Sequence, residues 1–242
     1  MLSAFLDDAG RISGIDVVTT WDTRLGPPPP LAAEFHLVEA VDEERRLFEQ
    51  LVVECDATCL IAPEFDAHLT RRAQCVTSQN RPLCGPDVFA IKLCADKLQL
   101  AGHLQKVKVA TIETFPFDPQ SGVDVAPGFP CVVKPRYGAG SQETRLIADA
   151  AALASVIDEI GPDSLLYGGI VQPFIPGIAV SLAVNVGKCG TCRHCFPPAI
   201  QRLTNDGRFS YLGGQVPAQN VPSLLLERLA IDACNAVPGL QG

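Results

Sequence analysis

The residues with the clearest capacity for chemistry lie in one short segment, where a lysine ends an apolar run and a loop of small residues follows. Residues 130–135 have the apolar character of a strand that contains Lys134, and Gly138, Gly140 and Ser141 lie in the loop after it. Glycine lets backbone N–H groups approach anionic oxygens that a Cβ would crowd, and an ammonium group is a compact positive charge. This segment therefore predicts a phosphate-binding site.

The spacing in this segment excludes two common nucleotide-binding loops. No Gly-Lys-Ser/Thr sequence opens a helix here, as a Walker loop requires, and residues 138–140 lack the third glycine of a dinucleotide fingerprint. A tight β-hairpin that carries a lysine by chance is the structural alternative for residues 134–141.

Two other segments supply groups that a nucleotide could use. Residues 171–177 run from a strand into a turn and include Gln172, Phe174 and Ile175. The edge of such a strand can pair with the ring edge of an adenine through its backbone, while Phe174 and Ile175 cover the face of the ring. Further upstream, Lys97 lies on a predicted helix and supplies a second cation.

The order of these segments resembles the ATP-grasp superfamily. Its members place a lysine after an aspartate on a helix, then a Val-Lys-Pro strand, a lid of small residues, and a hinge of the form Gln/Glu-x-Phe/Trp-Ile/Leu-x-Gly. The resemblance covers nearly the whole chain, and it implies that Lys97 and Lys134 contact the phosphates of ATP. It also implies the following lid and adenine residues: Arg136, Gly138, Gly140 and Ser141 in a lid over residues 136–141, and Gln172, Phe174 and Ile175 at the adenine.

The resemblance implies an ATP-dependent ligase that forms a C–N bond in two steps. ATP phosphorylates a carboxylate, and an amine then displaces phosphate from the acyl phosphate. Lysines and Mg²⁺ would neutralise the charge on the transferring phosphoryl group. The implied partners are ATP, Mg²⁺ and small-molecule carboxylate and amine substrates, and a homo-oligomer is left open. No catalytic residue and no metal ligand is assigned.

A narrower resemblance rests on residues 201–217, which include Asp206-Gly207-Arg208. They are similar to a carbamoyl-phosphate-synthase-like branch that includes tyramine–glutamate ligase of methanofuran biosynthesis. This implies glutamate as the acid and a tyramine-like amine, in a one-carbon carrier pathway. Two alternatives stay open: another amino-acid or peptide ligase of the same superfamily, and a nucleotide-binding or metal-binding module without catalysis.

The chain departs from the superfamily pattern in places that bear on these alternatives. Ala179 stands where many relatives carry a glutamate that holds the ribose. The superfamily binds magnesium through an Asp followed by Glu-x-Asn, and no such pair follows Gly214. Since the sequence stops at Gly242, where a relative would begin its next strand, we expect the ATP-grasp region to be incomplete at its C-terminus. We likewise expect an opening strand to be missing before residues 1–10.

A second chemical hypothesis concerns Cys189, Cys192 and Cys195, which form a Cys-x2-Cys-x2-Cys run. Two or three thiolates of this kind can bind zinc or an iron–sulfur cluster, although no second Cys-x2-Cys pair supplies a fourth ligand. The run also falls where two strands should be joined by a turn. A structural turn, a metal site and a redox pair are the three interpretations, and we favour the turn.

The elements expected around these segments define an α/β protein. A small N-terminal parallel α/β domain covers residues 1–115, and an α+β ATP-grasp region covers residues 116–242. The predicted strands are residues 14–20, 55–62, 107–112, 130–135, 144–147, 170–173, 179–186, 199–203 and 208–212. The predicted helices are residues 1–10, one that Asp42 caps, 65–79, a single helix after residue 87, one from the cap Asp149 to residue 160, and 223–237, with a linker over 115–128.

Composition and charge narrow the classes of partner. The 242 residues carry a net charge of −8, so no basic surface remains that could neutralise nucleic-acid phosphates. The acidic start lacks the basic region of a secretory signal, and polar residues and prolines interrupt the apolar stretch over residues 169–186, which excludes a membrane span. We therefore expect a cytoplasmic protein without nucleic-acid or membrane partners, in which most cysteines pack as small apolar residues.

Overall fold

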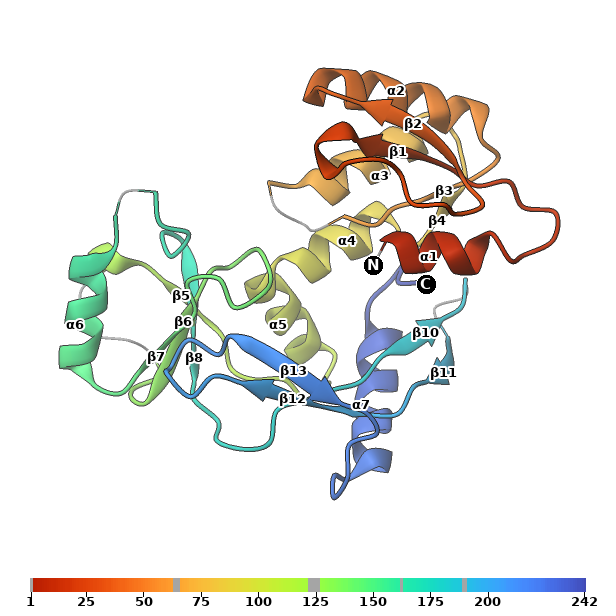
Figure 1. The fold of residues 1–242 in the computed structure, drawn as a ribbon. Helices are drawn as coiled ribbons and strands as arrows, with labels where there is room; N and C mark the ends of the chain where they lie inside the picture. Colours follow the sequence, from red (N-terminus) through yellow and green to blue (C-terminus); the bar gives the residue numbers. More distant parts are fainter. Residues whose placement is uncertain (1, 63–65, 122–126, 162, 189–190) are drawn as a thin grey trace. The chain divides into compact units, whose positions relative to one another are not determined.

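The computed structural model describes residues 2–62, 66–121, 127–161, 163–188 and 191–242 (Figure 1). The chain forms two compact units. The first comprises residues 1–61 and 71–84, and the second comprises residues 62–70 and 85–242. The division of the sequence into domains at residue 115 stays a prediction. In the part of the chain that is described, no helix is long and apolar enough to cross a membrane.

The first unit consists of short strands and helices. Its elements are α1 (Leu2–Ala9), β1 (Val18–Asp22), the 3-10 turn η1 (Thr23–Leu25), β2 (Glu34–Val38), α2 (Val41–Glu54), β3 (Thr58–Cys59), most of α3 (His68–Ser78) and β4 (Leu83–Cys84). Strand β1 pairs in parallel with β2, and β3 pairs in parallel with β4. Arg72 of α3 forms an ion pair with Glu44 of α2 and lies over the ring of Phe48, so these two helices contact each other. The predicted parallel α/β pattern is confirmed.

Two local predictions for this unit are wrong. Residues 34–38 form β2, where no strand is predicted. Helix α2 begins at Val41, and its N-cap residue is Ala40, which makes no side-chain hydrogen bond. Asp42 lies inside the first turn, where a carboxylate stabilises a helix through the helix dipole rather than as a cap. The predicted start of the next helix, at residue 65, lies outside the described residues.

The second unit is built on a four-stranded antiparallel sheet. Its strands, in the order β5-β8-β6-β7 across the sheet, are β5 (Phe115–Phe117), β8 (Gly169–Pro173), β6 (Cys131–Lys134) and β7 (Arg145–Ile147). Helix α6 (Ala150–Glu159) packs beside this sheet (Figure 1). Asp149 caps α6, since its carboxylate accepts a hydrogen bond from the Ala152 N–H at 2.8 Å. The predicted cap and the predicted strands 130–135, 144–147 and 170–173 are confirmed.

The main core of this unit lies between the sheet and α6. Val133 of β6 and Val171 of β8 are direct partners across the two strands, and both are buried there. Leu153 of α6 packs against them and is also fully buried. Burial of one such side chain stabilises a fold by about 1.5–3 kcal/mol. One face of the sheet is therefore occupied by apolar packing.

Two short helices precede the sheet, where a single helix is predicted. Helix α4 (Val88–Ala95) ends before Asp96, and α5 (Lys97–Lys106) begins directly after it. Asp96 has extended backbone angles, with φ −97° and ψ 98°, and its carboxylate accepts hydrogen bonds from two N–H groups of the first turn of α5, both at 3.1 Å. A side chain that caps a new helix competes with continuation of the previous one. The prediction of one continuous helix is wrong for this reason.

The rest of the unit contains short strands and one long helix. These elements are the 3-10 turn η2 (Pro119–Ser121), β9 (Val180–Ser181), β10 (Val184–Val186), β11 (Cys192–Cys195), β12 (Ala199–Leu203), β13 (Tyr211–Gln215) and α7 (Ser223–Ala236). Strands β13, β12 and β9 form an antiparallel sheet in that order, and β10 pairs with β11. Helix α7 contacts β10 and β11. The predicted hairpin and the predicted last helix are confirmed.

Several boundaries in this unit differ from the prediction. Residues 107–112 contain no strand, and β5 lies inside the predicted linker, of which residues 122–126 are outside the description. The single strand predicted over residues 179–186 is divided into β9 and β10. The second strand of the hairpin begins at Tyr211 rather than at residue 208. Each of these errors concerns a short run that local sequence pattern alone does not delimit.

Candidate functional site

Lys134 and Gln172 lie on the face of the sheet that is opposite to the core. Val133 pairs with Val171, and both pack on the side of α6. Side chains alternate between the two faces along a strand, so the residue that follows each of these valines faces the other side. Alternating burial along β6 agrees with this arrangement. One face of the sheet thus carries the core, and the other carries two of the predicted nucleotide contacts.

Both predicted phosphate-binding lysines are in surroundings that disfavour their positive charge. Burial lowers the pKa of Lys134 below its ordinary value. The pKa of Lys97 is lowered mainly by burial and also by the charge of Lys134, while Asp96 acts in the opposite direction. A nearby anion stabilises the charged form of a buried ammonium group, so the two lysines favour a negatively charged ligand. A polyphosphate has this charge and can span two cations.

The lid contacts Lys97 directly. The Lys97 Nζ donates to the carbonyl oxygen of Gly138 at 2.9 Å and to that of Arg136 at 3.4 Å. Its backbone N–H also donates to the Arg136 carbonyl, at 3.2 Å. Gly138 and Gly140 have φ values of +90° and +71°, which a side chain would strain. A Cβ at Gly140 would meet open space, so this glycine is required for its backbone conformation and not for lack of room.

Asp96 and Tyr137 are part of this site, although neither is among the predicted contacts. Asp96 is 1% exposed, and the Nε and Nη2 atoms of Arg136 donate to its two carboxylate oxygens at 2.7 and 2.6 Å. The Tyr137 hydroxyl donates to the same carboxylate at 3.0 Å, and the Gln99 side-chain amide donates to it at 2.8 Å. The spacing Asp96-x-x-Gln99 is close to a capping-box signature, which is the local signal that could have located Asp96.

The predicted adenine residues follow one another at the end of β8. Gln172 is 9% exposed, and its side-chain amide donates to the Thr114 hydroxyl at 2.8 Å. The Phe174 N–H donates to the Pro130 carbonyl at 3.0 Å, immediately before β6. Ile175 is 67% exposed. Gln172 and Phe174 are therefore fixed by contacts within the unit, and the Ile175 side chain is accessible to a ligand.

The turn between β12 and β13 contacts both the lid and the hinge. The Ser141 hydroxyl donates to the Phe209 carbonyl at 2.8 Å. The ring of Phe209 lies 6.1 Å from that of Phe174 between centroids, with the two planes inclined by 31°. Phe209 is not a predicted site residue, because its approach to Phe174 is a contact between distant parts of the sequence. The structure thus gathers predicted residues of the lid and hinge and adds a second aromatic ring.

The lysines and aromatic rings are chemically suited to a polyphosphate and a planar ring, whereas a metal needs oxygen ligands. Mg²⁺ takes oxygen ligands, and in nucleotide sites it is usually held by one or two carboxylates together with phosphates. Within the described ranges, no group of three or more His, Cys, Asp or Glu side chains could hold a metal ion. The nucleotide contacts predicted for the lysines and the lid stay predictions.

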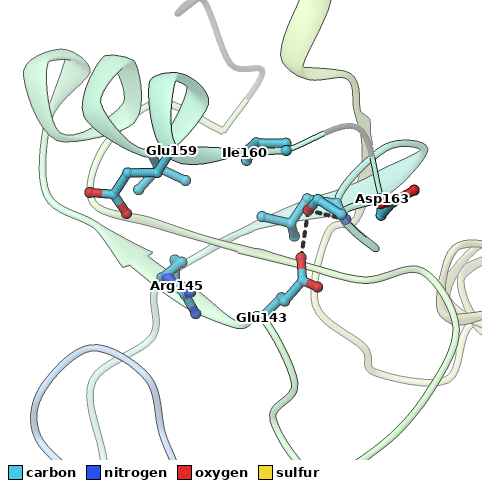
Figure 2. Close-up of a pocket in the computed structure, with 9 residues that line it drawn as sticks. Glu143, Arg145, Glu159, Ile160 and Asp163 are labelled. Atoms are coloured by element: carbon cyan, nitrogen blue, oxygen red, sulfur yellow. Dashed lines mark hydrogen bonds between the residues drawn. The ribbon is translucent and has the colours of Figure 1, made fainter.

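A cavity of about 340 Å³ lies in a different place, beside β7 and α6 (Figure 2). Glu143, Glu159 and Asp163 line it together with Arg145, and the Ser164 hydroxyl donates to Glu143 at 2.5 Å. None of the residues that line it is a predicted nucleotide contact. The carboxylates repel a polyphosphate, so this cavity is not the place for one.

Two of the three cysteines of the predicted run are among the described residues. Cys192 and Cys195 belong to strand β11, so the predicted turn is wrong for these two residues. Their Sγ atoms are 3.5 Å apart, and Cys189 lies outside the described residues. Burial raises the pKa of Cys195 to about 11, with further contributions from Cys192 and from the charge of Glu227. A thiol with this pKa is protonated at neutral pH, which disfavours reactive thiolate chemistry.

We expect that changing Cys189 and Cys192 to serine leaves the melting temperature of the protein nearly unchanged. A structural zinc stabilises a fold strongly, so its loss would lower the melting temperature by many degrees. Purified wild-type protein should contain far less than one zinc or iron per chain by elemental analysis. Cys84→Ser, at an exposed cysteine, is the matched control. Metal close to one atom per chain that the double variant loses would contradict this prediction.

Comparison with known families gives two matches. The family described as an ATP-grasp domain matches residues 94–242, and the one described as a pre ATP-grasp 3 domain matches residues 15–91. The first match covers more than half of the chain and includes every predicted nucleotide contact. No curated protein matches the chain.

Several solved structures are similar to this chain. An ATP-grasp superfamily protein from Archaeoglobus fulgidus is 22% identical over 88% of the chain, with a TM-score of 0.60. L-amino acid ligase from Bacillus licheniformis is 19% identical over 98%, with a TM-score of 0.71. The biotin carboxylase domain of 2-oxoglutarate carboxylase from Hydrogenobacter thermophilus, solved with MgADP, is 14% identical over 99%, with a TM-score of 0.73. The chain spans 57%, 58% and 56% of the length of these three structures, in that order.

The family matches and the structural similarity agree on the fold. The predicted fold class, a mixed α/β ATP-grasp fold with an N-terminal pre-ATP-grasp domain, is confirmed. At these identities the solved structures bear on the fold alone. The match over residues 94–242 identifies the family: the chain belongs to the ATP-grasp superfamily.

Proposed function

We propose that this chain is the nucleotide-binding part of an ATP-dependent carboxylate–amine ligase. The observation that carries the proposal is the position of Lys97 and Lys134. Burial lowers the pKa of both ammonium groups, each lies next to the glycine-containing lid, and the charge of one disfavours the charge of the other. Such a pair binds the phosphates of ATP, while Phe174, Ile175 and Gln172 lie on the hinge where the adenine binds.

The reaction has two steps, and the lysines contribute to the first. A carboxylate oxygen of the acid attacks the γ-phosphorus of ATP, the bond to the β,γ-bridging oxygen breaks, and ADP leaves. The amine nitrogen then attacks the acyl carbon, phosphate leaves with the electron pair of the C–O bond, and the nitrogen loses a proton. Positive charge at Lys97 and Lys134 reduces repulsion between the phosphates and the incoming carboxylate. Magnesium would add charge neutralisation through the phosphates.

The relatives support this class of reaction and not a particular substrate. One similar structure is an L-amino acid ligase, and another is a biotin carboxylase domain that was solved with MgADP. The sequence of residues 201–217 supports a narrower proposal, in which glutamate is the acid and the amine is tyramine-like. The free cysteines among the described residues support a cytoplasmic setting.

The proposed activity is tested by measuring ADP release with glutamate, with other amino acids, and with tyramine and simple amines. We expect repeated turnover only when an acid and an amine are both present, because ADP forms in the first step but the acyl phosphate occupies the site until an amine attacks it. Calorimetric titration with ATP in the presence of Mg²⁺ tests nucleotide binding separately. Absence of ATP binding by a folded wild-type protein would contradict the proposed function.

For the adenine site, we expect Phe174→Ala to weaken ATP binding and to leave tripolyphosphate binding unchanged. Phe174 lies on the hinge and packs 6.1 Å from the ring of Phe209, so its loss removes a surface that covers the adenine. An aromatic contact contributes about 0.5–1.5 kcal/mol, or about two- to tenfold in affinity. Competition binding with the two ligands measures this difference. The same loss with both ligands would place Phe174 away from the adenine.

A further inference from the structure

The carboxylate of Asp96 joins two segments that are distant in the sequence. Its oxygens cap the first turn of α5 and also accept the two hydrogen bonds from Arg136, together with those from Tyr137 and Gln99. Arg136 thus contacts Asp96 through both Nε and Nη2, which is the bidentate arrangement that fixes an arginine most firmly. At 1% exposure, the carboxylate is shielded from water that would compete for these bonds.

Residue Lys97, the next along the chain, holds the adjacent part of the lid. Its backbone N–H and its Nζ donate to the carbonyl oxygens of Arg136 and Gly138. Two consecutive residues at the start of α5 therefore contact three consecutive residues at the start of the lid. The lysine contacts are to neutral carbonyl oxygens, and a phosphate oxygen is a stronger acceptor for an ammonium group.

The charges in this cluster determine which positively charged side chains are available to a ligand. Burial by itself raises the pKa of Asp96, but the hydrogen bonds from Arg136, Gln99 and Tyr137 outweigh it, and the carboxyl pKa lies well below its ordinary value. The hydrogen bonds to Asp96 raise the pKa of Arg136, and burial together with Asp96 raises that of Tyr137. Asp96 is therefore ionised, its charge offsets that of Arg136, and Tyr137 acts as a neutral donor.

We propose that Asp96, Arg136 and Tyr137 form a latch that holds the start of the lid in place whether or not nucleotide is bound. These three are positioning residues, because they act on the nucleotide through the lid. Lys97 exchanges its carbonyl partners for phosphate oxygens when ATP enters, while the latch keeps Gly138 close to the phosphates. The part of the inference that concerns ATP rests on the proposed function, and the part that concerns the lid does not.

The variant Asp96→Asn removes the pairing with Arg136 and keeps the N-cap of α5. Asparagine is as good an N-cap residue as aspartate, so α5 should keep its start. The charge and the bidentate pairing with Arg136 are lost. Asp149→Asn is the matched control, because Asp149 caps α6 in the same way and makes no contact with the lid among the contacts that are described. Thermal melts of both variants by circular dichroism check that the protein stays folded.

The first readout is hydrogen exchange by mass spectrometry on peptides that cover residues 135–143, in protein without nucleotide. Loss of a charged hydrogen bond corresponds to a change of roughly tenfold or more in the equilibrium constant for local opening. We therefore expect amide exchange in this segment to become at least about tenfold faster in Asp96→Asn, with Tyr137→Phe between it and the wild type, and unchanged in Asp149→Asn. Unchanged exchange in folded Asp96→Asn would overturn the latch, whatever the result with ATP.

The second readout is ATP affinity in a double-mutant cycle of Asp96→Asn and Arg136→Lys. Lysine keeps the charge of Arg136 but cannot form the fork with a carboxylate. We expect each single variant to bind ATP about tenfold more weakly, and the double variant to bind no more weakly than either, because both remove one interaction. Additive losses, or wild-type affinity of Arg136→Lys, would show that Arg136 acts as a direct ligand instead. If the wild-type protein did not bind ATP, the proposed function would be refuted. The hydrogen-exchange result would then still test the latch, because it is measured without nucleotide.

Discussion

Lys134→Ala should weaken the binding of ATP by about ten- to a hundredfold. A charge-assisted hydrogen bond to a phosphate contributes about 1.5–3 kcal/mol, and one kilocalorie and a half is close to a tenfold change in affinity. Lys134 lies at the end of β6 on the face of the sheet opposite to the core, and burial shields its charge from water. Isothermal titration calorimetry of ATP with the wild type and the variant measures the change.

The matched control is Lys188→Ala, because Lys188 is exposed and lies outside the lid and the hinge. It should bind ATP as the wild type does. If both variants bound ATP as tightly as the wild type, Lys134 would not be part of the nucleotide site. If both lost the same large amount of affinity, ATP would be held by non-specific attraction to positive charge.

In the absence of nucleotide, the wild type should be less stable than a variant that has an apolar side chain in place of Lys134. The folded pKa of Lys134 lies below its unfolded value, so the unfolded state binds more protons between the two values, and wild-type stability rises with pH over that window. Lys134→Met lacks this titration. We expect the variant to melt at an equal or higher temperature near neutral pH, and the difference to shrink toward pH ~10.4. The charge of Lys134 that is proposed to bind ATP therefore lowers the stability of the protein without nucleotide.

The parts of the fold that the sequence predicts well are those that local chemistry determines. The strand at residues 130–135 is apolar and ends in a lysine and a proline, and the structure contains β6 there. Asp149 precedes a regular apolar period and caps α6. The last helix, α7, follows from the same kind of period. In each case the residues that form the element also carry the pattern that indicates it.

The parts that escape prediction depend on contacts between distant residues. Nothing near Arg136 indicates that Asp96 binds its guanidinium group, and nothing near Phe209 indicates the ring of Phe174. The break between α4 and α5 belongs to the same class, because the carboxylate that interrupts the helix is also held by the lid. The pattern finds the two lysines, and the three-dimensional structure shows that the carboxylate of Asp96 is paired with Arg136 at the start of the lid.

Gly169 of β8 lies in close contact with the end of β6, where Lys134 is located. A Cβ at Gly169 would lie 2.9 Å from the carbonyl oxygen of Lys134 and 2.9 Å from that of Leu166. Both are backbone atoms, which cannot rotate away as a flexible side chain can. Strand β8 would have to move relative to β6 at Lys134, which is the residue proposed to bind phosphate.

Gly169→Ala is therefore expected to lower the free energy of unfolding by about 1–3 kcal/mol, the usual cost of overpacking in a closely packed interior. It should also weaken ATP binding, because the shift displaces Lys134. Gly102→Ala is the control: Gly102 lies in α5, a Cβ there meets open space, and alanine should stabilise the helix by about 0.5–1 kcal/mol. Urea unfolding and calorimetric titration measure the two effects. If Gly169→Ala kept the stability and the ATP affinity of the wild type, strands β6 and β8 would not be as close at Lys134 as the structure has them.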